Sequence, residues 1–281
     1  MYQKIPCVKN ELLDTIKNSV AAFGLTKLKY TYREACIRVR RSNDNQEKDI
    51  GFCGNLLDTA ALLAFTGSNS GYISKWYDQS KNELDATQTT ATMQPRIVNN
   101  GVLDTDGLYY NGGVALNTNM TFADTALIDW NTTWSIVMIL DNLSRTGVFE
   151  CNFSKTNNSA NVNGFRIAIS ASSPYTRFRY WNGSSETTTD MQITDSEIRN
   201  GGKQMLTITR NGNNLKSYLG STQKVNITNF APPVTLNNNT TIFNIMSCNG
   251  ASSYTQGNCK ALILFSRDLS EQEINKLSAG L

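Results

Sequence analysis

The strongest constraint on the chemistry of this chain is that its 281 residues include no histidine. Without an imidazole, a Ser-His-Asp or Cys-His mechanism cannot be built, and the common zinc sites are excluded as well. Any catalysis would have to use carboxylates, lysine, tyrosine or a metal held by oxygen ligands. The sequence therefore favours a binding or structural protein over an enzyme.

A pair of carboxylates is the catalytic chemistry that remains open. Glu150 follows an apolar segment, and three further acidic residues lie on a polar stretch, Asp190, Asp195 and Glu197. A retaining glycosidase needs two carboxyl groups about 5–5.5 Å apart, and no spacing in the chain indicates such a pair. Residues 104–107 resemble a calcium loop but lack the later acidic ligand of that pattern. We therefore predict no catalytic residue, no metal site and no cofactor.

Aromatic residues beside turns are the candidates for ligand binding. Trp76 and Tyr77 end an alternating segment, and Asp78 and Asn82 follow them in a turn. In a binding role, Trp76 or Tyr77 stacks on a sugar ring while Asp78 and Asn82 form hydrogen bonds to it. In a structural role, which is the simpler one, one aromatic lies in the core and Asp78 holds its own turn. Because neighbouring side chains of a strand point to opposite faces, only one of the two aromatics can face the core.

Two other aromatic positions are weaker candidates. Trp181 and Asn182 lie at the tip of an expected hairpin, where the tryptophan would contact a ligand or a subunit, or cover an open edge. Tyr109 and Tyr110 precede another turn, and we expect one of them in the core. The predicted ligand-binding residues are therefore Trp76, Tyr77, Asp78, Asn82, Tyr110, Trp181 and Asn182.

Charge, cysteines and hydropathy limit the partners. The net charge of +3 is too small to indicate nucleic acid, and acidic residues follow the basic run Arg38, Arg40 and Arg41, which we interpret as a solvated face. No segment approaches the ~20 apolar residues of a membrane span, and the N-terminus has no signal-peptide pattern. We therefore expect a protein folded in a cytoplasm, with its six cysteines mostly as buried free thiols.

Most of the elements that would position these residues are short strands. Apolar residues at three- and four-residue steps predict a helix over residues 10–23, and Asp58 and Gly67 would bound a second one. Residues 134–140 predict a central strand buried on both faces, and residues 204–219 predict a hairpin around Asn-Gly. A capping box at residues 270–273 predicts a final helix.

Many short strands at hairpin spacing, with helices only at the margins, predict an all-β fold, a jelly-roll β-sandwich of the concanavalin A-like kind. We expect residues 1–30 to form an N-terminal helical segment, which is a candidate attachment element. Residues 31–281 would form the sandwich domain.

Two stretches carry a resemblance to known families. The closing residues, ALILFSRDLSEQEINKL, resemble the last strand and helix of laminin G-like and concanavalin A-like lectin domains. The stretch IRVRRSNDNQEKDIGF…LDTAALLAF…GYISKWYDQSKNELDATQTTATMQPRIVNNG resembles the N-terminal part of the arabinofuranosidase B catalytic domain, as that part recurs in bacteriophage tail and virion proteins. The resemblance implies either a retaining glycosidase, with two carboxylates and a vicinal cysteine pair, or a virion protein. No two cysteines of this chain are adjacent.

Three functions follow as expectations. The first is a bacteriophage virion structural protein in a tail fibre, tail tip or capsid-surface position, assembled in the host cytoplasm. Its partners would be other virion proteins, copies of itself in a homo-oligomer and a host cell-surface glycan, without nucleic acid or membrane insertion. The alternatives are an arabinofuranosidase-like glycoside hydrolase acting on surface polysaccharide, and a bacterial carbohydrate-binding or adhesion module.

Overall fold

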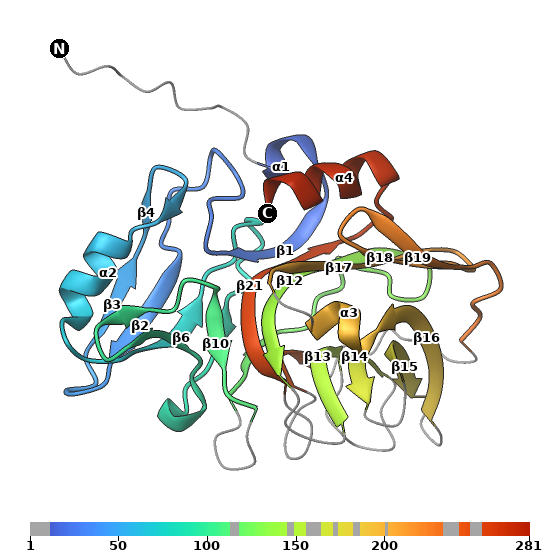
Figure 1. Ribbon diagram of the computed structural model, residues 1–281. Helices are drawn as coiled ribbons and strands as arrows, with labels where there is room; N and C mark the ends of the chain where they lie inside the picture. Colours follow the sequence, from blue (N-terminus) through green and yellow to red (C-terminus); the bar gives the residue numbers. More distant parts are fainter. Residues whose placement is uncertain are drawn as a thin grey trace.

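The described part of the chain is all-β. The computed structural model describes residues 12–112, 118–144, 149–155, 164–170, 174–181, 186–199, 202–232, 242–247 and 255–281. Within them, nineteen strands belong to one system of antiparallel pairings, and two more form a separate hairpin (Figure 1). This confirms the all-β prediction, while the jelly-roll connectivity stays a prediction.

The strands before the middle of the chain are short. They are β1 (Ser19–Gly24), β2 (Ile37–Arg41), β3 (Glu47–Ile50), β4 (Phe52–Cys53), β5 (Leu56–Leu57), β6 (Gly71–Trp76), β7 (Ala86–Thr87), β8 (Arg96–Asn99), β9 (Val102–Leu103), β10 (Leu108–Tyr110) and β11 (Met120–Phe122).

Most of the later strands are longer. They are β12 (Thr133–Ser144), β13 (Phe149–Lys155), β14 (Gly164–Ser170), β15 (Tyr175–Trp181), β16 (Glu186–Thr194), β17 (Gln204–Asn211), β18 (Asn214–Leu219), β19 (Thr222–Ile227), β20 (Phe243–Ile245) and β21 (Gln256–Phe265).

Strand β12 is central, as the sequence predicts. It pairs with β17 along one edge and with β21 along the other, and residues 134–141 are all buried. The predicted hairpin is also present, because β17 and β18 pair up to Asn211 and Asn214 around Gly212, whose φ of 60° suits glycine.

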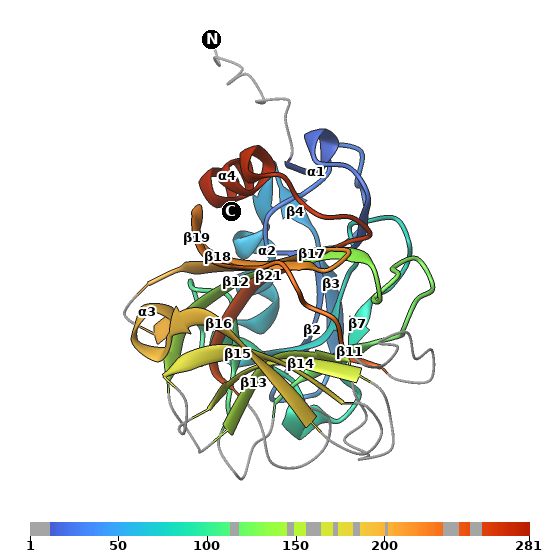
Figure 2. The ribbon, with the colours of Figure 1, turned by 90° about the vertical axis from the view of Figure 1, so that its right-hand side faces the viewer.

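Aromatic side chains fill the space between two layers of strands. Figure 2 shows β13–β16 lying below the layer that contains β12, β17 and β18. Trp134 on β12 stacks on Phe165 of β14 and Phe178 of β15, with ring centroids 6.1 and 5.5 Å apart. Since all three side chains are fully buried, this contact holds the two layers together.

The predicted helix over residues 10–23 is wrong beyond its first turn. Helix α1 covers only Leu12–Thr15, and Asn18 has a φ of 66°, which ends any helical path. The following residues form β1, which is buried throughout and pairs with β21. These residues therefore belong to the same sheet as the rest of the chain, and an attachment role for residues 1–30 stays a prediction.

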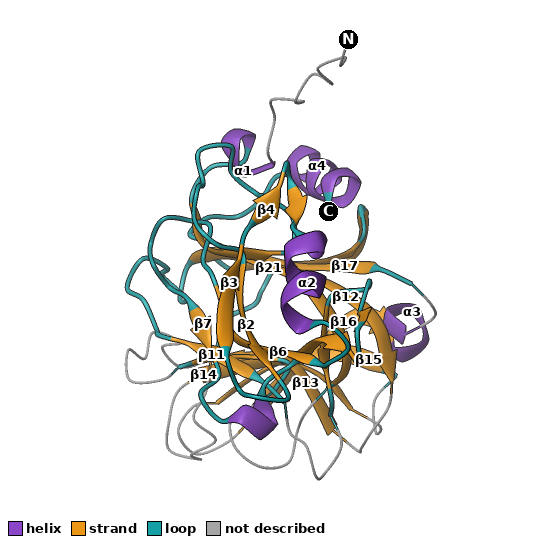
Figure 3. Ribbon diagram, turned by 90° about the vertical axis from the view of Figure 1, so that its left-hand side faces the viewer, coloured by secondary structure: helices purple, strands orange, loops and turns teal. Residues whose placement is uncertain are grey.

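The other helices are short and peripheral. Helix α2 (Thr59–Thr66) lies beside β3 (Figure 3), and, as predicted, Asp58 caps its first turn and Gly67 ends it. Helix α3 (Asp195–Arg199) follows β16, and a 3₁₀ turn, η1 (Ala91–Met93), precedes β8. Helix α4 (Glu271–Gly280) lies beside α1 and has the predicted capping box between Ser270 and Glu273.

The cysteines are partly as expected. Cys36 and Cys259 are buried free thiols, and Cys53 is free and exposed. Cys151, however, is disulfide-bonded, so the expectation of free thiols is wrong for this residue. Disulfides are typical of oxidising compartments.

Candidate functional site

The turn after Trp76 ties β6 to β1. The Asp78 carboxylate is buried and accepts hydrogen bonds from the amide N–H of Ala22 (2.8 Å), from both donors of Ser80 and from the amide N–H of Leu84 (3.2 Å). Asn82 is exposed, but its side-chain amide donates to the carbonyl of Val20 (2.7 Å). Asp78 and Asn82 thus hold the backbone, which favours the structural role over ligand binding.

Trp76 and Tyr77 point to opposite faces, as the strand geometry requires. Trp76 has no exposed surface and packs against Phe23, with ring centroids 5.7 Å apart. Tyr77 is half-buried, and its hydroxyl donates to Asp49 (2.8 Å); burial and this hydrogen bond raise its pKa to about 12. Of the pair, Tyr77 alone could touch a ligand.

The remaining candidates are Tyr110, Trp181 and Asn182. Tyr110 is fully buried, so its ring cannot stack on a ligand, and it is its neighbour Tyr109 that reaches the surface. Trp181 ends β15, but its side chain and all of Asn182 lie outside the described residues. Among the five candidates whose side chains the structure describes, Trp76 and Tyr110 are buried in the core and Asp78 holds the backbone, so these five do not form one ligand-accessible site.

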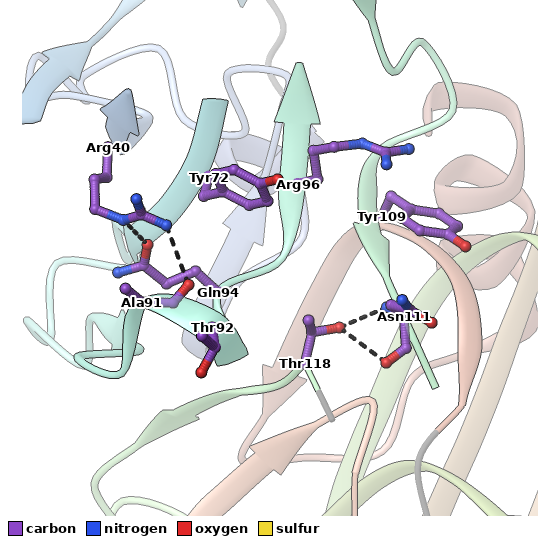
Figure 4. Close-up of a pocket in the computed structure, with 9 residues that line it drawn as sticks. All are labelled: Arg40, Tyr72, Ala91, Thr92, Gln94, Arg96, Tyr109, Asn111 and Thr118. Atoms are coloured by element: carbon purple, nitrogen blue, oxygen red, sulfur yellow. Dashed lines mark hydrogen bonds between the residues drawn. The ribbon is translucent and has the colours of Figure 1, made fainter. Parts of the chain in front are cut away.

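A pocket of about 360 Å³ lies on another part of the sheet (Figure 4). It falls in the range typical of small-molecule sites, toward its lower end. Its lining comes from β2, β6, β8, β10, the turn η1 and the segments beside them. The lining residues are Arg40, Tyr72, Ala91, Thr92, Gln94, Arg96, Tyr109, Asn111 and Thr118.

Four of these residues form one row across four strands. Arg40 on β2 pairs with Tyr72 on β6, Tyr72 pairs with Arg96 on β8, and Arg96 pairs with Tyr109 on β10. Directly paired residues of antiparallel strands project from the same face, so the four side chains lie side by side. We call this row of alternating arginines and tyrosines the Arg–Tyr row.

Each arginine of the row lies over a tyrosine ring. The Arg40 guanidinium carbon is 5.1 Å from the centroid of Tyr72, and that of Arg96 is 4.7 Å from the centroid of Tyr109. Such cation–π contacts fix the rings and the guanidinium groups relative to one another. All four side chains are half-buried, so each one keeps a surface that a ligand can reach.

Hydrogen bonds fix both arginines further. Arg40 donates to the side-chain oxygens of Gln94 (2.7 Å) and Asn45 (2.8 Å) and to the carbonyl of Ala91 (3.1 Å). Arg96 forms an ion pair with Asp104 (2.9 Å), which raises the pKa of the arginine above its already high ordinary value. The row is therefore held in place before any ligand arrives.

A second, more polar pocket of about 510 Å³ lies near the turn after Trp76 and includes four carboxylates, those of Glu34, Asp78, Glu83 and Asp85. Asp78 is engaged by backbone N–H groups, and Asp85 accepts from the Asp78 N–H (3.0 Å) and pairs with Lys75 (3.1 Å). These bonds occupy both carboxylates, so neither is poised as a nucleophile or a proton donor.

Glu150, the other carboxylate with a possible catalytic role, is buried on β13 and forms an ion pair with Arg199 of α3. It does not line either of these two pockets.

The described residues contain neither a metal-binding cluster nor a membrane-spanning helix. No group of three or more acidic or cysteine side chains there is arranged to hold a metal ion. In the same residues, no helix combines the length and the apolar character that a bilayer crossing requires.

Sequence reasoning missed the Arg–Tyr row. The sequence indicates a solvated basic face for Arg40, and of the two tyrosines at the end of β10 it offers Tyr110, not Tyr109, as the ligand contact. The available signal was alternation: Ile37 and Val39 mark the core face of β2, so Arg40 must point the other way. The pairing of Arg40 with Tyr72 and Arg96 depends on contacts between strands and has no local signal.

Comparison with known proteins shows similarity of fold. No protein-family model matches the chain, and the comparison with curated proteins gives no match either. Among solved structures, an arabinofuranosidase complexed with arabinofuranosyl-α-1,2-xylobiose has a TM-score of 0.62 at 12% identity, over 93% of this chain and 62% of that one. A GH54 α-L-arabinofuranosidase soaked with a cyclic sulfate inhibitor has a TM-score of 0.59 at 14% identity, over the same shares.

A third structure matches over its whole length. Domain 4 of AbnA, a GH43 extracellular arabinanase from Geobacillus stearothermophilus, in complex with arabinotriose, has a TM-score of 0.52 at 13% identity, over 93% of this chain and 100% of that one. This chain thus spans less than two thirds of the arabinofuranosidases but corresponds to the entire arabinanase domain. The chain therefore shares its fold with domains of carbohydrate-active enzymes.

Proposed function

We propose that this protein is a carbohydrate-binding module, built as a jelly-roll sandwich, that binds saccharides at the Arg–Tyr row and does not cleave them. The observation that carries the proposal is the row itself. It places two fixed aromatic rings and two fixed guanidinium groups in one pocket, together with the polar side chains of Gln94, Asn111 and Thr118.

The composition of the pocket suits a sugar. A saccharide presents apolar C–H faces between rings of hydroxyl groups, so it is bound best where aromatic surfaces alternate with hydrogen-bonding groups. The row offers this alternation over four strands. Strand pairing sets the spacing of its groups, and hydrogen bonds from the two arginines to neighbouring residues hold the guanidinium groups in place. Binding would therefore order few side chains that are not already ordered.

The fold similarity supports the same proposal. The arabinanase domain of matching length was solved with arabinotriose bound, so a domain of this architecture and size can bind an oligosaccharide. In the described residues, Asp78 and Asp85 of the polar pocket and Glu150 are each engaged by hydrogen bonds or an ion pair, unlike the open carboxylate pair that a retaining glycosidase uses. These observations favour binding over hydrolysis.

The virion setting is part of the proposal and rests on the sequence resemblance of residues 37–101. In that setting the module would contact a host cell-surface glycan, and a homo-oligomer would multiply weak individual contacts. Light scattering on the purified full chain tests the oligomer: a mass that is a multiple of the 31.1 kDa chain supports it, and a monomer contradicts it.

Calorimetric titration with oligosaccharides of bacterial surface polysaccharides and of arabinan tests the binding site. We expect binding by the wild type, a loss of at least about tenfold in affinity in the double variant Tyr72→Ala/Tyr109→Ala, and no change in Tyr30→Ala. Tyr30 is an exposed tyrosine that does not line the pocket, so it is the matched control. Failure of every saccharide to bind, or release of free sugar from an arabinofuranoside, would contradict the proposal.

A further inference from the structure

We propose that the pocket selects saccharides that carry a carboxylate, such as oligomers of uronic acids, over neutral saccharides of the same size. This inference rests on the proposed function, because it names the class of ligand for the Arg–Tyr row. It is drawn from the charges at the pocket and from the donors that remain on Arg40.

The lining of the pocket is charged with one sign only. Of its nine described lining residues, the two charged ones are Arg40 and Arg96, and none is acidic. A neutral sugar interacts with two guanidinium groups only through hydrogen bonds. A carboxylate is also attracted by their positive charge, and this attraction is stronger in a half-buried site than in water. The charge of the lining thus favours an anionic ligand.

Arg40 is fixed in place without being neutralised. Its three hydrogen-bond acceptors, on Gln94, Asn45 and Ala91, are all uncharged, and it forms no ion pair within the described part of the chain. A guanidinium has five N–H donors, so about two remain for a ligand. A carboxylate is the group whose geometry and charge match such a pair of N–H donors best.

Arg96 differs from Arg40 because it forms an ion pair, so the two ends of the pocket are not equivalent for a charged ligand. Its ion pair with Asp104 takes Nε and Nη2, at 2.9 and 3.3 Å, and compensates its charge. Arg96 therefore serves mainly to hold the ring of Tyr109. Arg40 lies opposite Glu47 of β3 but forms no ion pair with it in the described residues, so its guanidinium charge remains available to a ligand. A bound acidic saccharide would place its carboxylate at Arg40 and Gln94 and extend its rings along Tyr72 and Tyr109.

The buried amide of Gln94 completes the end of the pocket at which the carboxylate of the ligand would bind. Its oxygen accepts from Arg40, and its nitrogen donates to the carbonyl of Gln88 (2.9 Å). Because both ends of the amide are engaged, its orientation is set and the Arg40 side chain cannot turn away from the pocket easily. The guanidinium is thus preorganised for its partner.

The test compares two saccharides with the same sugar rings, one with free carboxylates and one in which the carboxylates are esterified. Trigalacturonate and its methyl ester have the same rings and hydroxyl groups, but the ester has no carboxylate. We expect the wild-type chain to bind the acid at least about tenfold more tightly than the ester, from the usual strength of hydrogen bonds to charged groups. The preference should shrink as salt is raised, because screening weakens the charge interaction.

A matched pair of variants locates the effect. Arg40→Gln should weaken binding of the acid at least about tenfold more than binding of the ester, so that the preference for the acid is lost. Arg38→Gln should change neither, because Arg38 lies on the same face of β2 but pairs with Asp49 outside the pocket. Thermal melts of both variants show whether each one is folded.

The possible outcomes separate this inference from the proposed function. Equal binding of acid and ester, lost in Tyr72→Ala/Tyr109→Ala, would overturn the acidic selectivity and keep the saccharide site. Equal affinity for trigalacturonate and for acetate would overturn it too, because the pocket would then be a simple anion site. Because the comparison of acid with ester uses the wild type, it remains decisive if Arg40→Gln does not fold.

Discussion

Tyr72 of β6 lies directly opposite Arg96 of β8, and on its other side it lies opposite Arg40 of β2. The tyrosine therefore stands between two arginines in a row that continues to Tyr109. The backbone of each of these four residues is positioned by the pairing of its strand. The proposed saccharide site depends on this arrangement.

Tyr77 and Tyr109 allow the two candidate sites to be compared directly. Both are half-buried tyrosines, but Tyr109 lines the pocket, whereas Tyr77 hydrogen-bonds Asp49 on a different part of the sheet. Tyr109→Ala should weaken saccharide binding about fivefold or more, and Tyr77→Ala should leave it unchanged. A loss of affinity in Tyr77→Ala alone would place the ligand at the turn after Trp76 instead.

Asp78 is predicted to matter for stability and not for binding. Replacing it with alanine removes four hydrogen bonds and leaves the buried N–H of Ala22 without its partner. We expect Asp78→Ala to lower the free energy of unfolding by about 2 kcal/mol or more, as measured in urea, and Asp78→Asn to cost less because it keeps an acceptor oxygen. Unchanged stability with lost saccharide binding would show that Asp78 is a ligand contact after all.

The sequence predicted the frame of the fold better than the site. The strand around Ile136, the caps at Asp58 and Ser270 and the turn at Gly212 have local signals, and the structure contains all of them. The helix over residues 10–23 failed because the spacing of its larger apolar residues hid an unbroken apolar run, residues 20–23. Such a run is typical of a strand buried on both faces.

The site was harder to predict for a physical reason. Trp76 and Tyr77 stand out in the sequence because they are adjacent to a turn, yet that turn serves to hold β1. Arg40, Tyr72 and Arg96 are unremarkable one by one, and only strand pairing across long stretches of sequence brings them together. Local patterns give the face on which each residue lies but not its neighbour on the next strand.

Glu273 is predicted to make the free energy of unfolding depend on pH. Its hydrogen bonds to Arg267 and to the cap residue Ser270 lower its pKa from 4.5 to about 2. The carboxylate therefore stabilises the fold above pH 4.5, and this contribution is lost as the pH falls toward 2. Glu273→Gln should cost about 1 kcal/mol at pH 7 and nothing near pH 2, as measured by thermal melts across pH.

The neighbouring Glu271→Gln is the control for that series, since Glu271 lies in the same first turn without a part in the capping box. It should lower the free energy of unfolding by less than Glu273→Gln does at pH 7, and its effect should not follow the titration of Glu273. A constant difference between Glu273→Gln and the wild type from pH 7 to pH 2 would contradict the role given to the carboxylate.

The free cysteines should differ in reactivity. Cys53 is exposed, whereas burial raises the pKa of Cys259 to about 12 and that of Cys36 further still. Because the thiolate is the reactive form, iodoacetamide should label Cys53 in the native protein and the other two only after denaturation. Mass spectrometry of the labelled peptides checks this, and rapid native labelling of Cys36 would contradict the burial of this residue.

The most direct test of the central claim is a crystal structure of the full chain with trigalacturonate bound. The account predicts that the sugar rings lie against Tyr72 and Tyr109 with a carboxylate within hydrogen-bond distance of Arg40. A saccharide bound at the polar pocket beside Asp78 and Asp85, with the Arg–Tyr row empty, would contradict it.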